Sequence, residues 1–280
     1  MDGRHPTPQR GLDGLTSAEL SASRQGLWDR AFTELILTRI PGGTTALVDV
    51  GCGLATAAHA LLPRLPRATY LGVDADEGRL QDARKLLAGL PYQNRAELRA
   101  GRADQLPCQD AQAKFVLTMM TLQHLPDPVA AIKDIARVLE PGGVLVAIEP
   151  DNTNNLFYFD AVLPQLNNAF RDLFTAQRRQ RRPADIAIGP RVASLVELGH
   201  LSVVEFFPHV FGRTKKLAAH QFLDRVKQIT NMISADLPPG CAEVDACRAA
   251  LADTEAAVGG PTITGYACQF VPVFVCVAQK

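Results

Sequence analysis

The stretch Ala46-Leu47-Val48-Asp49-Val50-Gly51-Cys52-Gly53 decides the fold of this chain. Its apolar run predicts a buried strand, and the glycines that follow predict a sharp turn into a helix. Gly51 and Gly53 lack a Cβ, so the backbone of such a turn can approach a ligand closely. The stretch is typical either of a nucleotide-binding turn or of an ordinary tight turn that requires glycine.

A second apolar run, Tyr70-Leu71-Gly72-Val73-Asp74, favours the nucleotide-binding alternative. It places an acid about 20 residues after the glycine turn, where nucleotide-binding folds use an acid to hold a ribose. A dinucleotide-binding turn would have a small third residue where this chain has Thr56. The Lys-Ser/Thr pair of a phosphate-binding P-loop does not follow the turn either. Both departures weigh against those two classes of nucleotide site.

Strands and helices alternate along the first half of the chain. We expect strands near 45–50, 68–74, 96–100, 114–119 and 143–149, and helices near 27–40, 54–64, 77–89 and 127–139. Beyond residue 151 we expect helices near 161–180, 190–198, 215–233 and 241–257, and strands near 201–211 and 265–278. This order predicts the α/β class: a Rossmann-like, doubly wound, seven-stranded, mostly parallel sheet with an antiparallel last strand and a helical lid.

The composition argues against several classes of protein. With 29 Lys and Arg against 29 Asp and Glu, the chain has no net charge that would attract nucleic acid or an anionic membrane. No apolar run approaches the ~20 residues that span a bilayer, and residues 1–10 lack the apolar centre of a secretion signal. The six cysteines include no CxxC pair, which argues against a zinc site. We expect a cytoplasmic protein without metal, nucleic-acid or membrane partners.

Sequence motifs occur in a characteristic order between residues 40 and 151. They are Asp49-Val50-Gly51-Cys52-Gly53, Gly72-Val73-Asp74, Ala103-Asp104-Gln105-Leu106-Pro107, Leu122-Gln123-His124-Leu125-Pro126-Asp127-Pro128 and Leu139-Glu140-Pro141-Gly142-Gly143. In this order the chain resembles the class I S-adenosylmethionine-dependent methyltransferases, and most closely the small-molecule branch that includes the ubiquinone and menaquinone methyltransferases. The resemblance is strong over this part and loose elsewhere. It implies S-adenosylmethionine as cofactor and in-line methyl transfer to a small-molecule acceptor.

The composition and length of the chain, together with the resemblance, suggest a division of the chain. Residues 1–20, rich in Gly, Pro and polar groups, are expected to be a flexible tail. Residues 21–280 would form a single methyltransferase domain, with the cofactor-binding core over 21–151 and a substrate lid with sheet-closing strands over 152–280.

The resemblance assigns cofactor-binding roles to residues at the strand ends. Gly51 and Gly53 would admit the methionine part of the cofactor, and Asp49 would help to hold its ammonium group. Asp74 would accept hydrogen bonds from both ribose hydroxyls. A structural alternative for Asp74 is to cap the helix that follows, although Asp76 is better placed as that cap.

The adenine end of the cofactor is assigned to the third and fourth strands. Asp104 would receive the adenine amino group, and Ala103 and Gln105 would flank the ring. Met119, at the end of the fourth expected strand, would line the channel near the sulfonium. The alternative for Asp104 is a simple turn carboxylate.

Three side chains are candidates for a general base, which is needed only if the nucleophile must lose a proton. His124 follows the fourth expected strand and titrates near neutral pH, and its alternative role is to shape its own loop. Glu149 and Asp151, at the end of the fifth expected strand, could act as base or hold the substrate. Their alternative role is to cap a helix that begins after Asn152.

The expected lid contains two further groups with open interpretations. An aromatic cluster could cover an apolar substrate or belong to the core: Phe157, Tyr158, Phe159 and Phe170. A run of arginines at 178, 179, 181 and 182 could bind an anion or form a solvated helix end.

Two other functions are compatible with these motifs. A nucleic-acid methyltransferase is disfavoured by the charge balance and by residues 118–122, which lack the Asn/Asp-Pro-Pro-Tyr/Phe motif of exocyclic-amine DNA enzymes. A non-catalytic S-adenosylmethionine-binding protein is the other alternative, since fold does not fix function.

Overall fold

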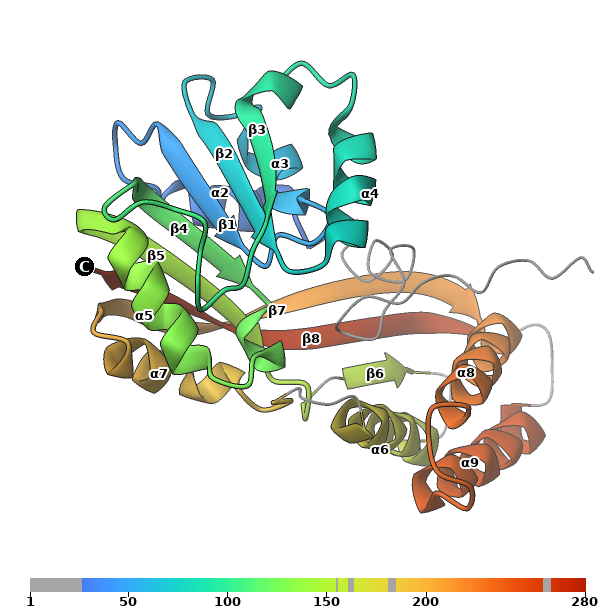
Figure 1. Ribbon diagram of the computed structural model, residues 1–280. Coiled ribbons are helices and arrows are strands. Elements are labelled where there is room, and N and C mark those ends of the chain that lie inside the picture. The colour runs from blue at the N-terminus through green and yellow to red at the C-terminus, as the bar shows by residue number, and fades with distance from the viewer. Residues whose placement is uncertain (1–26, 155, 161–163, 181–184, 259–262) are drawn as a thin grey trace, which may run out of the picture. The chain divides into compact units, whose positions relative to one another are not determined.

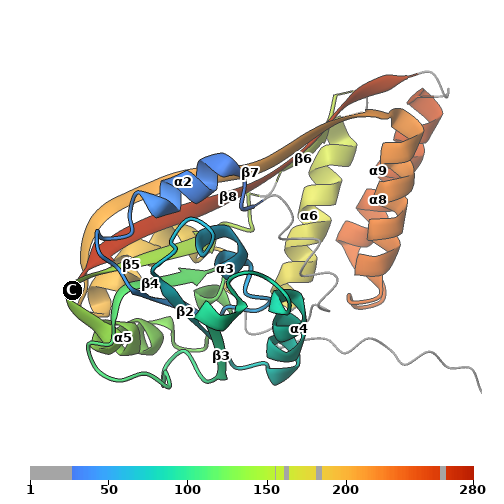
Figure 2. The same cartoon turned by 90° about the horizontal axis from the view of Figure 1, so that it is seen from above.

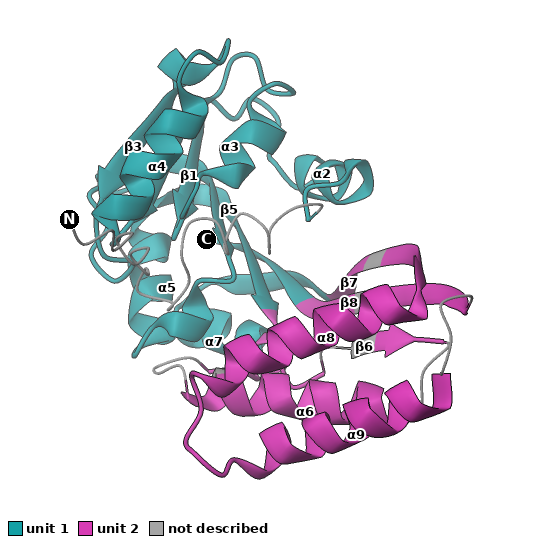
Figure 3. Ribbon diagram, turned by 90° about the vertical axis from the view of Figure 1, so that its right-hand side faces the viewer, with its two compact units in different colours: residues 1–149, 191–207, 274–280 teal, residues 150–190, 208–273 magenta. Residues whose placement is uncertain are grey.

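The computed structural model describes residues 27–154, 156–160, 164–180, 185–258 and 263–280. The chain divides into two compact units, which Figure 3 shows in different colours. Unit 1 holds residues 1–149, 191–207 and 274–280, and unit 2 holds residues 150–190 and 208–273. The expected tail over 1–20 lies outside the described residues, and the grouping of 21–280 into one domain stays a prediction.

The strands of the first half of the chain form a parallel sheet, seen in Figure 1. They are β1 (Ala46–Val50), β2 (Thr69–Asp74), β3 (Ala96–Ala100), β4 (Ala113–Met119) and β5 (Leu139–Pro150). Their order in the sheet is β3-β2-β1-β4-β5, and all four neighbouring pairs are parallel. The order of the strands reverses direction at β1. Ligands of such sheets bind beyond the carboxyl ends of the strands at this switch point.

Helices cover both faces of these strands, as the alternating pattern predicts. They are α2 (Arg30–Leu37), α3 (Thr56–Leu61), α4 (Glu77–Leu87), α5 (Pro128–Val138) and α7 (Val192–Leu198), with the 3-10 turns η1 (Gln93–Arg95), η2 (Leu122–His124) and η3 (Gly189–Arg191). Figure 2 shows α2 and α5 on opposite sides of the strands. The expected cap is confirmed, because the Asp76 side chain accepts a hydrogen bond from the backbone of Arg79 at the start of α4.

Three later strands complete the sheet: β6 (Leu156–Phe159), β7 (Ser202–Ala218) and β8 (Thr264–Gln279). β8 lies next to β5 in the strand order and runs against it, since Gly142 donates to Lys280 and Asp151 donates to Pro272. β6 is antiparallel to β8, and β7 also pairs with β8. The predicted Rossmann-like, mostly parallel sheet with an antiparallel last strand is confirmed.

Two details of the later elements differ from the prediction. β6 is an additional strand, and it makes the sheet eight-stranded. Its four residues have high strand propensity, but only their pairing with β8 shows that they form a strand. β7 continues to Ala218, where a helix was expected from residue 215. Local sequence favours a helix there, and pairing with a distant strand overrides it.

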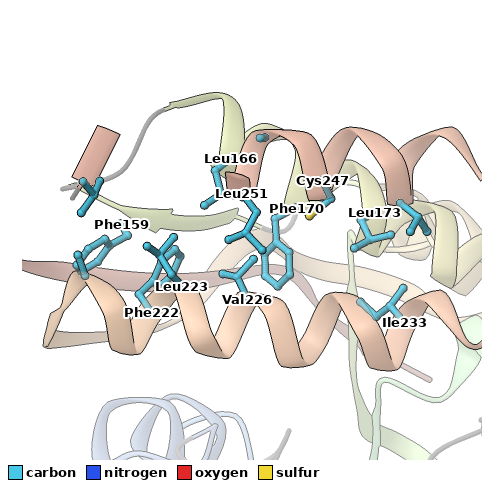
Figure 4. Packing of buried hydrophobic residues seen from close by; sticks show 14 of the residues in the cluster. Phe159, Leu166, Phe170, Leu173, Phe222, Leu223, Val226, Ile233, Cys247 and Leu251 are labelled. Atoms are coloured by element: carbon cyan, nitrogen blue, oxygen red, sulfur yellow. The ribbon is translucent and has the colours of Figure 1, made fainter. Parts of the chain in front are cut away.

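Unit 2 has a core of its own between three helices: α6 (Pro164–Gln180), α8 (Ala219–Ser234) and α9 (Ala242–Val258). Figure 4 shows Phe170, Val226 and Leu251 pointing toward one another from these helices. The ring of Phe159 stacks on Phe222 with centroids 4.8 Å apart. Phe159 and Phe170 therefore belong to a core, whereas Tyr158 of the same aromatic run is exposed. The expected role of this region as a lid stays a prediction.

Candidate functional site

The turn after β1 has an unusual backbone. Gly51, Gly53 and Ala55 all have positive φ, at +74°, +53° and +54°. The amides of Gly51 and Cys52 both donate to the carbonyl of Val73, over 2.7 and 3.1 Å. Residues with a Cβ rarely adopt this left-handed backbone conformation, whereas glycine adopts it without strain. The turn is thus bent tightly and held against the end of β2, as the glycine pattern predicts.

The carboxylate of Asp74 ties this turn to the start of α4. Its Oδ2 accepts a hydrogen bond from the amide of Gly53 at 2.8 Å, and its Oδ1 accepts one from the amide of Asp76 at 2.9 Å. Burial raises the pKa of Asp74, while these two amides act in the opposite direction. A carboxylate has about four acceptor positions. Asp74 can therefore hold the turn and still accept hydrogen bonds from two ligand hydroxyls.

Asp49 is a buried acid beneath the turn. Its side chain is 5% exposed, and its Oδ2 accepts a 2.5 Å hydrogen bond from the hydroxyl of Tyr70. Burial raises the pKa of Asp49 to about 7, although the Tyr70 hydrogen bond works against this increase. The negative charge of Asp74 raises the pKa further. A cationic ligand group near Asp49 would reverse this effect and stabilise the anion.

The missing side chain of Gly51 makes room for another loop of the protein. A Cβ on Gly51 would lie 2.2 Å from Oγ1 and 2.3 Å from Cγ2 of Thr121. The hydroxyl of Thr121 also lies 3.4 Å from the carbonyl of Gly51 and within hydrogen-bonding geometry. The glycine is required by both its φ and this contact. Thr121 thus occupies the space of the missing side chain, and the cofactor-binding role of Gly51 stays a prediction.

The loop after β4 is held by the end of β5. Met119 ends β4 and is half-buried, and Met120 has a φ of +55°. Glu149, fully buried, accepts hydrogen bonds from three successive amides: Oε1 from Thr121 at 2.9 Å and from Leu122 at 2.8 Å, and Oε2 from Gln123 at 3.3 Å. Glu149 was expected as a base, a substrate anchor or a helix cap. Its contacts are those of a cap, made to η2 of unit 1.

His124 and Asp151 belong to different units. His124 is the last residue of η2, half-buried, and its amide donates to the carbonyl of Thr121 at 2.9 Å. Asp151 is 7% exposed and accepts hydrogen bonds from the amide and hydroxyl of Thr153 and from the side chain of Asn154. The helix expected after Asn152 does not form, because the described chain continues into β6. Asp151 closes a turn there instead.

The loop after β3 carries the residues assigned to adenine. Asp104 binds Arg102 through both oxygens, with distances of 2.8 Å to Nε and 2.6 Å to Nη2. This ion pair lowers the pKa of Asp104, so its carboxylate is charged at neutral pH. Gln105 is exposed and Ala103 half-buried in the same tight loop, in which the amide of Gln105 donates to Arg102. Their adenine-binding roles stay predictions.

Three residues of this site were not identified from the sequence: Tyr70, Thr121 and Arg102. Tyr70 and Asp49 are 21 residues apart, and Thr121 lies 70 residues from Gly51. Only the parallel sheet brings these pairs together, so no local pattern could identify them. Arg102 lies two residues from Asp104, and that spacing was the one available signal.

No group of three or more His, Cys, Asp or Glu side chains in the described part of the chain could hold a metal ion. Among the described helices, none is both long and apolar enough to cross a membrane.

Known proteins resemble this chain chiefly over its parallel sheet. Residues 48–147 match the family model described as a methyltransferase domain. A trans-aconitate 2-methyltransferase of Methylobacterium nodulans is 32% identical over 118 residues, which are 42% of this chain and 43% of that protein. A demethylmenaquinone methyltransferase of Desulfitobacterium hafniense is 34% identical over 110 residues, which are 39% of this chain and 43% of that protein. The chain spans less than half the length of these two relatives.

The similarity of fold extends further than the similarity of sequence. A candidate methyltransferase of Bacillus halodurans has a TM-score of 0.54 and 19% identity, over 88% of this chain and 97% of its own. At this identity the comparison shows a shared fold. Because the aligned region covers 88% of this chain, the shared fold includes later strands and helices that the family model does not cover.

Proposed function

We propose that the protein is an S-adenosylmethionine-dependent methyltransferase that methylates a small-molecule acceptor, which the match of residues 48–147 to the methyltransferase domain and the shared fold support. The observation that carries the proposal is the hydrogen bond between the carboxylate of Asp74 and the amide of Gly53. It joins the two elements that a nucleoside cofactor needs, a ribose acceptor and a glycine turn. S-adenosylmethionine supplies an activated methyl group when it is bound there.

The residues at the strand ends fit this cofactor chemically. Asp74 has acceptor positions left for two hydroxyls, and Asp49 is a buried carboxyl whose anion an ammonium group would stabilise. Asp104, on the loop after β3, is a charged acceptor for the amino group of the adenine. Gly51, Gly53, Ala103, Gln105 and Met119 complete the set of residues that we assign to cofactor binding. Holding donor and acceptor in line can supply about 7–11 kcal/mol of the barrier.

We assign the role of proton acceptor, where the acceptor molecule requires one, to His124. An imidazole can take up a proton near neutral pH. Glu149 and Asp151 were the other candidates, but each already accepts three hydrogen bonds from its own neighbourhood. Both carboxylates are therefore engaged in holding local backbone turns, and His124 is the candidate that we retain.

The class of acceptor follows from charge and from the relatives. Trans-aconitate and demethylmenaquinone, the acceptors named for the two relatives, are small molecules. The chain has equal numbers of acidic and basic residues, so it lacks the excess positive charge that draws proteins to nucleic acid. We propose a small molecule as the acceptor and no nucleic-acid partner.

The cellular compartment that we propose for the protein rests on the redox state of its cysteines. All six cysteines are free thiols, and disulfides are rare in the reducing cytosol. We therefore propose that the protein acts in the cytoplasm. We also propose that residues 21–280 work as one methyltransferase domain.

Calorimetric titration of the full chain with S-adenosylmethionine tests the first step of this proposal. Saturable binding at one site is expected, and no heat at millimolar cofactor would refute it. Incubation with metabolite extracts and methyl-labelled cofactor should then label small molecules. Label found only in added RNA or DNA would support the nucleic-acid alternative, and binding without transfer to any fraction would support the non-catalytic one.

The labelled acceptor, once identified, allows the role of His124 to be tested. His124→Gln should lower kcat at least tenfold while changing cofactor affinity less than twofold, since general-base catalysis contributes ~10²–10⁴-fold. The acidic limb of the pH profile should disappear in the variant. An unchanged kcat would remove His124 from the mechanism.

A further inference from the structure

The fully buried carboxylate of Glu149 accepts hydrogen bonds from the protein's own backbone. Its oxygens accept the amides of Thr121, Leu122 and Gln123 over 2.9, 2.8 and 3.3 Å. Thr121 stands at the N-cap position of η2, but its own side chain makes no capping hydrogen bond. Glu149 thus caps the start of η2 from a neighbouring strand, because it accepts the free amides that a capping side chain of the helix itself would otherwise accept.

The loop held by Glu149 contacts the turn after β1 at Gly51. The side chain of Thr121 occupies the space where Gly51 would carry a Cβ, and its Oγ1 contacts both the carbonyl of Gly51 and that of Met119. The amide of Met120 donates to the carbonyl of Ile148 at 2.7 Å, directly before Glu149 in β5. A continuous chain of contacts therefore runs from β5 through Thr121 to the turn after β1.

The backbone of this loop would not keep its shape unaided. Met120 has a φ of +55°, a conformation that costs a residue with a side chain about 1–2 kcal/mol. Such strain persists only where surrounding contacts enforce it. Here the contacts are the carbonyl of Ile148 on one side and the carboxylate of Glu149 on the other.

We infer that Glu149 is a positioning residue, which fixes Thr121 against Gly51 and thereby sets the affinity of the cofactor site. This inference rests on the proposed cofactor site. Glu149 exchanges no proton with the substrate, and it acts on binding through Thr121. Removing its carboxylate should release the loop, and the turn at Gly51 should then lose the neighbour that holds it.

The test uses the full chain and measures the Kd of S-adenosylmethionine by calorimetry, which needs no acceptor. In Glu149→Gln one carbonyl oxygen can still accept a backbone amide, but the NH2 group that replaces the other oxygen is a donor and faces a backbone donor, and the negative charge is lost, so Kd should rise at least tenfold. Hydrogen exchange of the amides of residues 121–123 should become faster. Thr121→Ala should also raise Kd at least fivefold, but should add less than twofold in the Glu149→Gln background, because both substitutions break one chain of contacts.

A matched control separates positioning from general stability. Asp127 accepts the amide of Ala130 at the start of α5, so Asp127→Ala removes a carboxylate cap in the same unit. It should lower Tm and leave Kd within twofold of the unsubstituted chain. If Asp127→Ala raises Kd as much as Glu149→Gln does, the effect is one of stability and the inference is wrong.

The outcomes also separate this inference from the proposed function. No binding by the unsubstituted chain would refute the proposed cofactor. Binding by that chain with unchanged Kd in folded Glu149→Gln would overturn only the role of Glu149. Should Glu149→Gln not fold, Thr121→Ala decides the matter alone, since an unaltered Kd there would break the proposed link.

Discussion

The hydroxyl of Tyr70 donates a 2.5 Å hydrogen bond to the buried carboxylate of Asp49. Removing this donor should raise the pKa of Asp49 above its value of about 7, because the hydrogen bond stabilises the anion. At pH 7, Tyr70→Phe should therefore bind S-adenosylmethionine more weakly than the unsubstituted chain does. At pH 8.5 the difference in affinity between the two should be smaller. Calorimetry at both pH values checks this. Equal affinities at pH 7 would show that the hydrogen bond does not govern the charge of Asp49.

The charge of Asp49 should make cofactor binding depend on pH in a defined direction. Below pH 7 the free carboxyl takes up a proton and loses its attraction for the ammonium group, whose own charge is complete there. Affinity should fall by up to ~tenfold for each pH unit below 7. Asp49→Asn should bind weakly at every pH and lack this dependence. A pH-independent Kd in the unsubstituted chain between pH 5.5 and 7 would contradict the assignment.

Burial of Asp49 should also affect stability without cofactor. Its folded pKa lies above its ordinary value of 3.8, so the folded chain binds a proton more tightly than the unfolded chain. This contribution to stability is complete below pH 4 and is lost as the pH rises through 7. Asp49→Asn avoids the loss, so its Tm should exceed that of the unsubstituted chain at pH 8 by more than at pH 4.5. Thermal melts over this range measure the difference, and a constant offset would refute the explanation.

Asp74→Ala should weaken cofactor binding by about 10- to 100-fold, because hydrogen bonds to a charged group are worth about 1.5–3 kcal/mol. Asp76→Ala is the matched control, since Asp76 caps α4 two residues away through the amide of Arg79. The control should lower Tm and change Kd less than threefold. Calorimetry that finds equal losses of affinity in both variants would mean that the helix start, and not the carboxylate of Asp74, governs binding.

Gly51→Ala should destabilise the chain by two separable effects. A left-handed residue with a side chain costs about 1–2 kcal/mol, and overlap with Thr121 adds about 1–3 kcal/mol. Gly89→Ala isolates the first effect, because Gly89 has a φ of +79° and nothing within 4 Å of its Cβ position. Urea unfolding should show a larger loss for Gly51→Ala, partly recovered by adding Thr121→Gly. Equal losses for Gly51→Ala and Gly89→Ala would exclude the overlap.

The parallel half of the sheet could be predicted because each strand has a local signal. β3 occupies residues 96–100 as expected, and β1 and β2 begin one residue later than expected. The buried strand β1 is a largely apolar run, whereas the partly exposed β3 alternates apolar and charged residues, and glycine follows each of them. β6 gave no such signal, since four residues are too short for a pattern and only pairing with β8 defines them.

The site could be predicted only as far as its strand ends. Asp49, Asp74 and Glu149 are where the alternation of strands and helices places them, at the ends of β1, β2 and β5. Their partners could not be predicted, because Glu149 reaches amides 26–28 residues away and Asp49 meets Tyr70 across the sheet. The role of a buried acid depends on such partners. This is why the sequence offered Glu149 as a base, although its carboxylate accepts the backbone amides of the loop after β4.

The hydrogen bonds that hold the strand-end loops are made between groups of the protein itself. Gly53 is fastened to Asp74, and the loop at Thr121 is fastened to Glu149. A ligand that binds to such a preorganised rim loses little conformational entropy of the protein, so association should be fast and its heat-capacity change small. Evolution of new acceptors could then alter other parts of the chain without disturbing how the methyl donor is held.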